Sequence, residues 1–210
     1  MRTVESEAAE RTRSSIMRTL AHFREANQSK PEPTNERMGT ASIELPQVSA
    51  ALAAVTSMVS VVETFTMQIT SEKLRLSFKD QPRVAADALA EIEKQVDRSW
   101  ADRARGWRVW YDINAYEFAP FIAFISFVEA RNAAMHGDGR LTAKQLANDG
   151  GRAVITRLQQ VGIRTVAGKL ELDPKCVKTC ADACCGFTLW IDERISNASP
   201  VATKSRPHSE

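Results

Sequence analysis

Apolar residues recur at spacings of three and four along most of this chain, and this periodicity most constrains its fold. In residues 46–78 the series runs through Val48, Leu52, Val55, Val59 and Val62. An α-helix completes a turn every 3.6 residues, so these side chains share one face. Apolar and polar residues do not alternate in this block, as they would in a strand. The sequence therefore predicts a long helix here.

Turn-forming residues separate this helix from its neighbours. A polar helix over residues 5–27 has only a thin apolar stripe, so we expect it to rest on other helices. Pro82 suits the first position of a further helix, which the spacing extends through Trp100. Residues 112–116 are typical of a bend.

The next blocks carry clear start and stop signals. Pro120 is expected to open the most buried helix, because apolar residues face all directions over 121–128. Gly137 suits its end. Thr142 and Gln145 have the spacing of a capping box and predict another helical start, with the pattern resuming after Gly150-Gly151 as far as Gly162.

Near the end of the chain the pattern of apolar residues changes from helical spacing to alternation, before a final helix. Residues 163–172 alternate around Ala167-Gly168, which predicts a small hairpin, and a helix follows from Pro174 to about Ile195. The chain is thus mainly α. We divide it into an N-terminal helical extension and linker (1–36), a helical domain (46–195) and a polar, disordered tail (196–210).

Composition narrows the functional classes. With 43% hydrophobic residues the chain is not wholly disordered, and a net charge of +2 gives no overall basic field for nucleic acid. The strongly apolar, uncharged stretch 118–128 is eleven residues long, too short for a membrane helix of about 20. The first residues are charged and lack a secretory core. We therefore expect a cytoplasmic protein without a membrane span.

Two residue clusters have competing interpretations. Cys176, Cys180 and Cys184 share one face of the last helix, with Cys185 about 100° around it. Reduced core thiols are favoured over a metal site, whose ligands are usually split between two elements. The second cluster consists of aromatic residues, which could stack on nucleic-acid bases, but core packing is favoured for them as well. This cluster comprises Trp107, Trp110 and Tyr111.

Arg131 is the most unusual charged residue of the helix that Pro120 opens. It shares the stripe of Phe124, Phe127 and Val128, so its guanidinium needs a partner, and Glu129 is the local candidate. Asn132 and His136, four residues apart, are neighbours on one face of the helix. Taken alone, this spacing favours a structural arginine and a histidine placed at the helix end by the helix dipole.

The residues that follow Arg131 extend this pair into a longer motif. Arg131-Asn132, three residues, His136-Gly137 and then Gly139 to Thr142 resemble the signature of the HEPN superfamily (higher eukaryotes and prokaryotes nucleotide-binding). The string is most similar to the bacterial groups known as RiboL-PSP-HEPN or HEPN-like. The resemblance extends over residues 46–195. It implies an all-α helical bundle of HEPN type that dimerises and places two such motifs face to face.

The resemblance also implies site roles. His136 would transfer protons, Arg131 would hold the scissile phosphate, and Asn132 would orient His136 or a phosphate oxygen. Arg140 would add a substrate contact, unless it is only a solvated loop residue. No metal or other cofactor is expected, because Asp138 beside His136 supplies too few ligands.

Many proteins of this superfamily are metal-independent endoribonucleases of toxin–antitoxin or phage-defence systems, in which the RNA 2′-OH is the nucleophile. The sequence therefore predicts such a ribonuclease, with RNA, a second copy of the chain and an antitoxin protein as partners. The alternative is a non-catalytic HEPN domain that binds RNA, nucleotide or a partner protein. A third possibility is a purely structural helical protein.

The number of chemical groups supports the expected homodimer. One arginine and one histidine make a sparse site, and a two-fold dimer doubles both. The stripe through Phe124 and Val128 would either border that interface or fill the core of one chain.

Overall fold

The computed structural model describes residues 5–28, 45–78, 90–94, 96, 98–147 and 150–199. This part of the chain is all-α, with one small antiparallel hairpin before the last helix, as the sequence predicts. The predicted linker at 29–36 and the helix start at Pro82 lie outside the described residues, as does the predicted tail from residue 200 onward.

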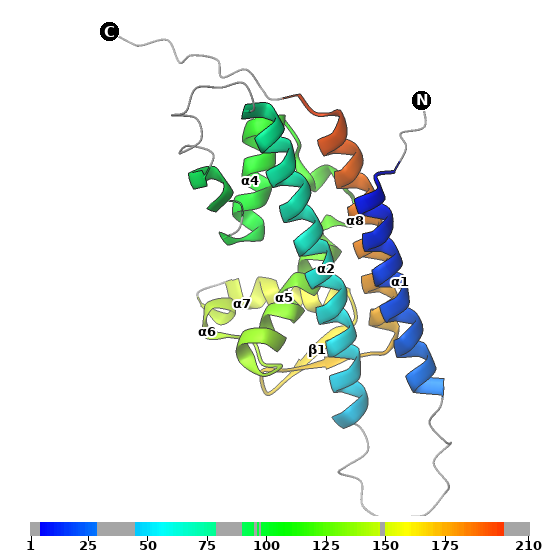
Figure 1. Cartoon of the computed structure of the whole chain (residues 1–210). Helices are drawn as coiled ribbons and strands as arrows, with labels where there is room; N and C mark the ends of the chain where they lie inside the picture. Colours follow the sequence, from blue (N-terminus) through cyan, green and yellow to red (C-terminus); the bar gives the residue numbers. More distant parts are fainter. Residues whose placement is uncertain are drawn as a thin grey trace, which may run out of the picture.

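Three long helices lie side by side and form the frame of the fold (Figure 1). They are α1 (Glu7–Gln28), α2 (Leu45–Phe78) and α8 (Lys175–Asn197). A fourth helix, α5 (Phe121–Gly137), packs against α2 and α8. The apolar series of α2 supplies core residues that include Val55, Val59 and Val62.

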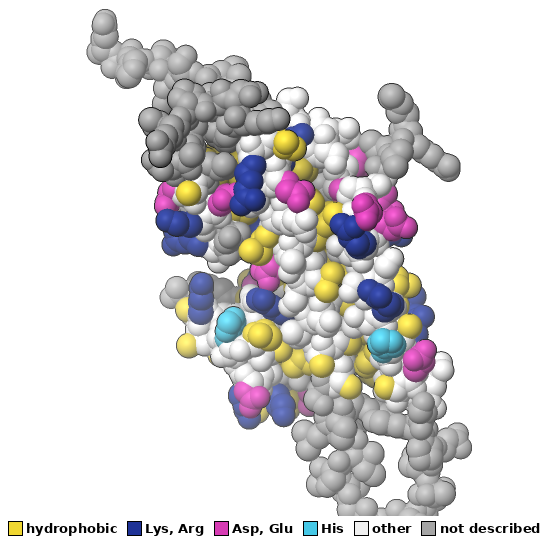
Figure 2. Space-filling model, viewed as in Figure 1, with side chains coloured by type: hydrophobic (Ala, Val, Ile, Leu, Met, Phe, Trp, Pro, Cys, Tyr) yellow, Lys and Arg dark blue, Asp and Glu magenta, His cyan; other side chains and the backbone are white. Residues whose placement is uncertain are grey.

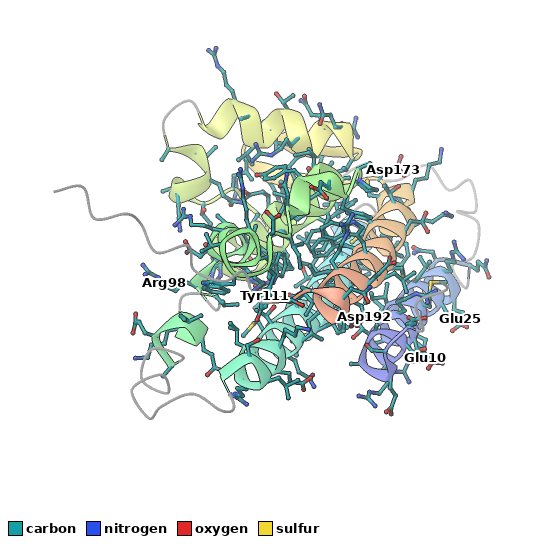
Figure 3. The ribbon with its side chains drawn as sticks, turned by 90° about the horizontal axis from the view of Figure 1, so that it is seen from above. Glu10, Glu25, Arg98, Tyr111, Asp173 and Asp192 are labelled. Carbon is teal, nitrogen blue, oxygen red and sulfur yellow. The ribbon has the colours of Figure 1, made fainter. Side chains whose placement is uncertain are left out.

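Helix α1 rests on α2 and α8, as its thin apolar stripe predicts. Ile16, Leu20 and Phe23 of this stripe are buried. Its start is fixed by α8, because Ser6 donates from its backbone N–H to Asp192 Oδ2 (2.9 Å) and from its hydroxyl to Asp192 Oδ1 (2.7 Å). Figure 3 shows Asp192 on the side of α8 that faces α1. The first helix is therefore packed into the common core.

Trp100 belongs to a helix of its own, which corrects the prediction that joined it to the preceding one. Helix α4 (Trp100–Tyr111) starts there because Ser99 is extended and its hydroxyl accepts the N–H of Asp102 at 3.1 Å. The left-handed Asp112 ends α4, and the short 3-10 helix η1 (Ala115–Glu117) follows within the predicted bend.

The elements that surround α5 follow the predicted signals. The capping box at Thr142 and Gln145 starts α6 (Ala143–Leu146), which has one turn, and α7 (Gly150–Gln160) comes after the predicted interruption. Strands β1 (Ile163–Val166) and β2 (Lys169–Leu172) form the hairpin. Leu141 donates its N–H to the Gly168 carbonyl at 3.0 Å, so the loop after α5 is tied to the hairpin turn.

One helix among the described residues, α2, passes a test of length and composition for a membrane span, and the expectation of no such span did not take it into account. Its residues Ala50–Ser77 are long and apolar enough to cross a membrane by length and composition, with a mean hydropathy of 1.5. The prediction considered 118–128 and overlooked that no charge stands between Glu44 and Glu63. Central helices of globular domains share this composition, and α2 contacts α1, α5 and α8.

Candidate functional site

The motif residues gather at the C-terminal end of α5. Arg131, Asn132 and His136 lie in its last turns, and Arg140 follows in the loop. The helix stops here because Asp138 adopts a left-handed conformation with φ of 50°, followed by Gly139 with φ of 74°. A helix end of this kind leaves its last side chains at the surface of the bundle.

Arg131 is held by two contacts on different elements. Its Nη2 lies 2.8 Å from Oε2 of Glu63, in the middle of α2, and its Nη1 donates to Asn132 Oδ1 at 3.1 Å. The side chains of Arg131 and Glu63 are 22% and 20% exposed. The guanidinium is thus fixed at the edge of the core with a small face open to solvent.

Glu129, the local candidate partner, is engaged elsewhere. Gln145 donates from Nε2 to Glu129 Oε2 at 2.7 Å, and Arg157 Nη2 lies 3.9 Å from the other carboxylate oxygen. Glu129 therefore ties α5 to α6 and α7, whereas Arg131 ties α5 to α2.

A second arginine approaches the same carboxylate from α4. Arg103 has a side chain that is 0% exposed, and its Nη2 lies 4.0 Å from Oε1 of Glu63. Its guanidinium stacks over the Trp100 ring at 4.5 Å, and Nη1 lies 3.5 Å from Thr66 Oγ1. Glu63 thus lies between two guanidinium groups, so both arginines have this carboxylate within 4.0 Å.

His136 and Arg140 are both exposed. His136 lies in the last turn of α5. Arg140 donates from Nη1 to the Ala167 carbonyl at 2.9 Å, so it anchors the motif loop to the hairpin turn. Within the described residues no hydrogen bond or ion pair joins His136 to Arg131. The structure therefore brings Arg131 and Asn132 together and leaves His136 open to a ligand.

The sequence analysis missed Glu63 and Arg103. Glu63 is the sole charged residue between positions 45 and 71, and this was the available signal. A carboxylate alone in an apolar helix requires a basic partner, just as Arg131 required an acidic one. Arg103 offered no comparable signal, because α4 carries several arginines at ordinary helical spacing.

The cysteines and most of the aromatic residues pack in the core. Cys176, Cys180 and Cys184 are buried, and burial raises the pKa of the Cys176 and Cys180 thiols, so they are neutral thiols at physiological pH. Trp107 and Tyr111 are buried as well, with Trp107 Nε1 donating to Thr70 Oγ1 at 2.9 Å. No group of three or more His, Cys, Asp or Glu side chains in the described part of the chain is arranged to hold a metal ion.

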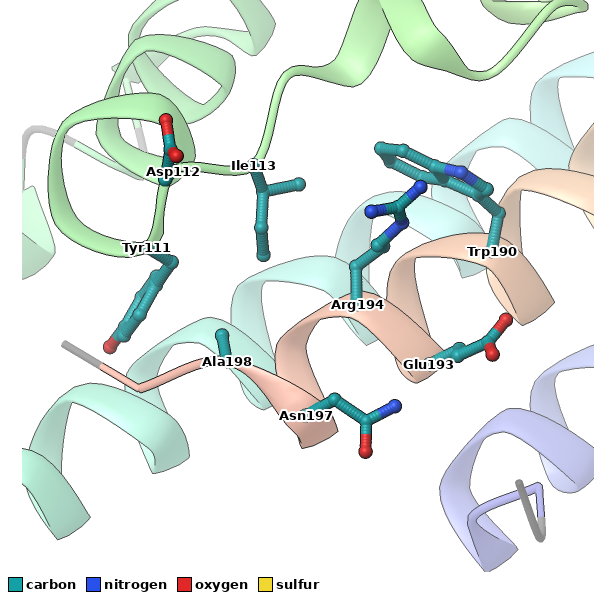
Figure 4. A pocket seen from close by; sticks show the side chains of 8 residues that line it. All are labelled: Tyr111, Asp112, Ile113, Trp190, Glu193, Arg194, Asn197 and Ala198. Carbon is teal, nitrogen blue, oxygen red and sulfur yellow. The ribbon is translucent and has the colours of Figure 1, made fainter. Parts of the chain in front are cut away.

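A surface pocket of about 380 Å³ lies between the end of α4 and the end of α8 (Figure 4). Its Arg194 stacks over Trp190 at 5.5 Å and pairs with Glu117 at 3.5 Å. The pocket contains none of the motif residues. It is lined by Tyr111, Asp112, Ile113, Trp190, Glu193, Arg194, Asn197 and Ala198.

Charges of both signs are interspersed on the face shown in Figure 2. This mixed surface agrees with the small net charge of +2. A polyanion on this face would therefore be bound through a local cluster of side chains.

Comparison with protein-family models, with curated proteins and with solved structures finds no match for this chain.

Proposed function

We propose that this protein is a metal-independent endoribonuclease of HEPN type that acts as a toxin or phage-defence effector in the cytoplasm. The observation that carries the proposal is the end of α5. There Arg131 is fixed by Glu63 and Asn132 while His136 is free to meet a ligand. A fixed cation and an accessible imidazole, here at the same helix end, are what RNA cleavage needs when the RNA supplies the nucleophile.

The proposed reaction uses the 2′-OH of the substrate. As the 2′-oxygen forms its bond to phosphorus, its proton passes to a base, and the bond to the 5′-oxygen breaks as that oxygen takes up a proton. The products are a 2′,3′-cyclic phosphate and a 5′-OH. His136 is the proposed proton-transfer group. Arg131 stabilises the charge that builds on the phosphate oxygens, with Asn132 orienting His136 or the phosphate. Arg140 is a proposed substrate contact.

A homodimer completes this proposal. Cleavage needs a base, an acid and a charge stabiliser, for which one histidine and one arginine are few groups, whereas a two-fold axis beside α5 would supply a second His136 and a second Arg131. An antitoxin protein would restrain the enzyme by covering this shared cleft. Sedimentation should show twice 23.3 kDa, and activity per chain should fall on dilution below the dissociation constant of the dimer. A monomer that keeps full activity at every concentration would refute the shared site.

The decisive experiment incubates the purified chain with structured and single-stranded RNA, with and without EDTA. We expect cleavage that survives EDTA and leaves cyclic-phosphate ends. His136→Ala and Arg131→Ala should each abolish cleavage while the far-UV circular dichroism is unchanged. Activity that disappears in EDTA and returns with Zn²⁺ or Mg²⁺ would overturn the metal-free mechanism.

One observation favours a second candidate, a HEPN domain that binds RNA, nucleotide or a partner protein without cleaving. Both terminal nitrogens of Arg131 already have protein partners, which leaves fewer of its donors for a phosphate. In that case the wild type would bind RNA without cleaving it. Arg131→Ala and His136→Ala would then change binding alone.

A further inference from the structure

Glu63 occupies an unusual place for a carboxylate. It is the sole charge in residues 45–71 of a long apolar helix, and its side chain is 20% exposed. Taking a carboxylate out of water is costly unless cations accompany it. Two cations do so, Arg131 at 2.8 Å and Arg103 at 4.0 Å.

We propose that Glu63 positions Arg131 for a phosphate ligand, and that buried Arg103 is the second partner that keeps Glu63 compensated when Arg131 shares its charge with the ligand. The phosphate part of this inference rests on the proposed function. The hold of Glu63 on Arg131 does not depend on that function and can be measured without RNA.

The contacts of Arg131 explain how such positioning works. Glu63 engages Nη2 and Asn132 engages Nη1, so the plane of the guanidinium is fixed from two sides. Each terminal nitrogen carries two N–H bonds, so one donor on each remains available to a phosphate. Arg131 Nε is buried without a hydrogen-bond partner among the described residues, which leaves the two terminal contacts to set the orientation.

Arg103 cannot take the role of Arg131. Its side chain is 0% exposed and its guanidinium lies over Trp100, so no phosphate in solvent can reach it. Its charge instead faces Glu63 from the core side. When a phosphate takes up the remaining donors of Arg131, the carboxylate of Glu63 still has a second cation within 4.0 Å. Binding of the phosphate therefore does not leave Glu63 with Arg131 as its single cation.

Glu63→Gln should affect RNA binding and kcat in opposite directions. This difference separates a positioning role of Glu63 from a purely structural one. Glu63→Gln removes a negative charge beside the phosphate site, so RNA should bind more tightly than to the wild type and KM should fall. The same change loosens Arg131, and a misplaced catalytic cation lowers kcat by about 10–100-fold. A merely structural role would lower the folded fraction and leave KM unchanged.

The matched control is Glu72→Gln. Glu72 lies on the same helix, is exposed, and accepts a hydrogen bond from Gln68 at 2.9 Å. We expect its kcat and KM for RNA to equal those of the wild type. If Glu63→Gln also keeps wild-type kcat and KM while the wild type cleaves RNA, the inference about Glu63 is overturned and the proposed function stands.

A second measurement needs no RNA. Phenylglyoxal modifies arginine side chains, and mass spectrometry locates the adduct. In the wild type, Arg131 should react more slowly than exposed Arg152. In Glu63→Gln the Arg131 rate should rise several-fold, and in Glu72→Gln it should not change. Equal Arg131 rates in the wild type and Glu63→Gln would overturn the proposed hold.

The two measurements separate the two proposals. A wild type that neither binds nor cleaves RNA, with Arg131 released in Glu63→Gln, refutes the proposed function and supports the hold of Glu63 on Arg131. If Glu63→Gln does not fold, Glu63→Asp carries the same two readouts. It keeps the charge but shortens the side chain, so it should release Arg131 in part and lower kcat less.

Discussion

Substitutions along α5 should separate residues that hold the fold from residues available for chemistry. Phe124 is fully buried, and its ring lies 4.6 Å from that of Phe187 and 4.9 Å from that of Trp100. Truncation of a buried Phe to Ala costs about 3–5 kcal/mol. The two ring contacts place Phe124→Ala toward the upper end, at about 4–5 kcal/mol. For a chain of this size that lowers Tm by about 8–20 °C.

The assay is thermal and urea unfolding followed by circular dichroism at 222 nm. His136→Ala is the comparison on the same helix, because an exposed side chain outside the core changes stability by less than about 0.5 kcal/mol. The expected loss of unfolding free energy is about four times larger than 1 kcal/mol. A Phe124→Ala variant whose free energy of unfolding lies within about 1 kcal/mol of the wild type would therefore refute the packing argument. A His136→Ala variant as unstable as Phe124→Ala would mean that its loss of activity reports unfolding.

Two further predictions concern the hairpin turn and the thiols. Ala167 has φ of 49° and precedes Gly168, so Ala167→Asn should raise stability by about 0.5–1 kcal/mol, seen as a higher Tm; an unchanged or lower Tm would contradict the turn geometry. Burial raises the pKa of half-buried Cys185, an effect that nearby Arg13 opposes, so its alkylation by iodoacetamide should be slow at neutral pH and accelerate as the pH rises toward the raised pKa. Cys180 should be labelled only on unfolding, and its labelling before Cys185 in the native protein would contradict the described burial.

The helices were predictable because their signals are local. Helical spacing located α2, the pair Thr142 and Gln145 located α6, and the turn at Ala167-Gly168 located the hairpin. The break before α4 was missed because apolar spacing of three and four continues across it. The local signal for that break was a capping hydroxyl at Ser99 with Asp102 three residues on.

The candidate site was predictable only where its contacts are local. Arg131 and Asn132 are adjacent, and the sequence alone placed them on one helix. The pair between Arg131 and Glu63 joins two helices far apart in the chain, so it depends on how α5 packs against α2. The sequence showed two residues that each needed a partner. Tertiary packing decided that Glu63, and not the nearer Glu129, would serve Arg131.

Because Glu63 lies near two arginines, Glu63→Ala and Arg131→Ala should lower the free energy of unfolding by different amounts. Arg131→Ala leaves Glu63 with Arg103 at 4.0 Å, so the loss should stay near the value of a hydrogen bond to a charged group, about 1.5–3 kcal/mol. Glu63→Ala removes the carboxylate from both arginines, and one of them, Arg103, has a side chain that is 0% exposed.

Breaking a buried pair costs about 3–5 kcal/mol, so Glu63→Ala should destabilise the chain by about 1–2 kcal/mol more than Arg131→Ala. The double variant should match Glu63→Ala closely, because the contact that Arg131 makes is already lost. Urea unfolding of the three variants measures this order. If Arg131→Ala costs more than Glu63→Ala, Arg103 does not act as a second partner of the carboxylate, and the proposed sharing of Glu63 between two arginines has no structural basis.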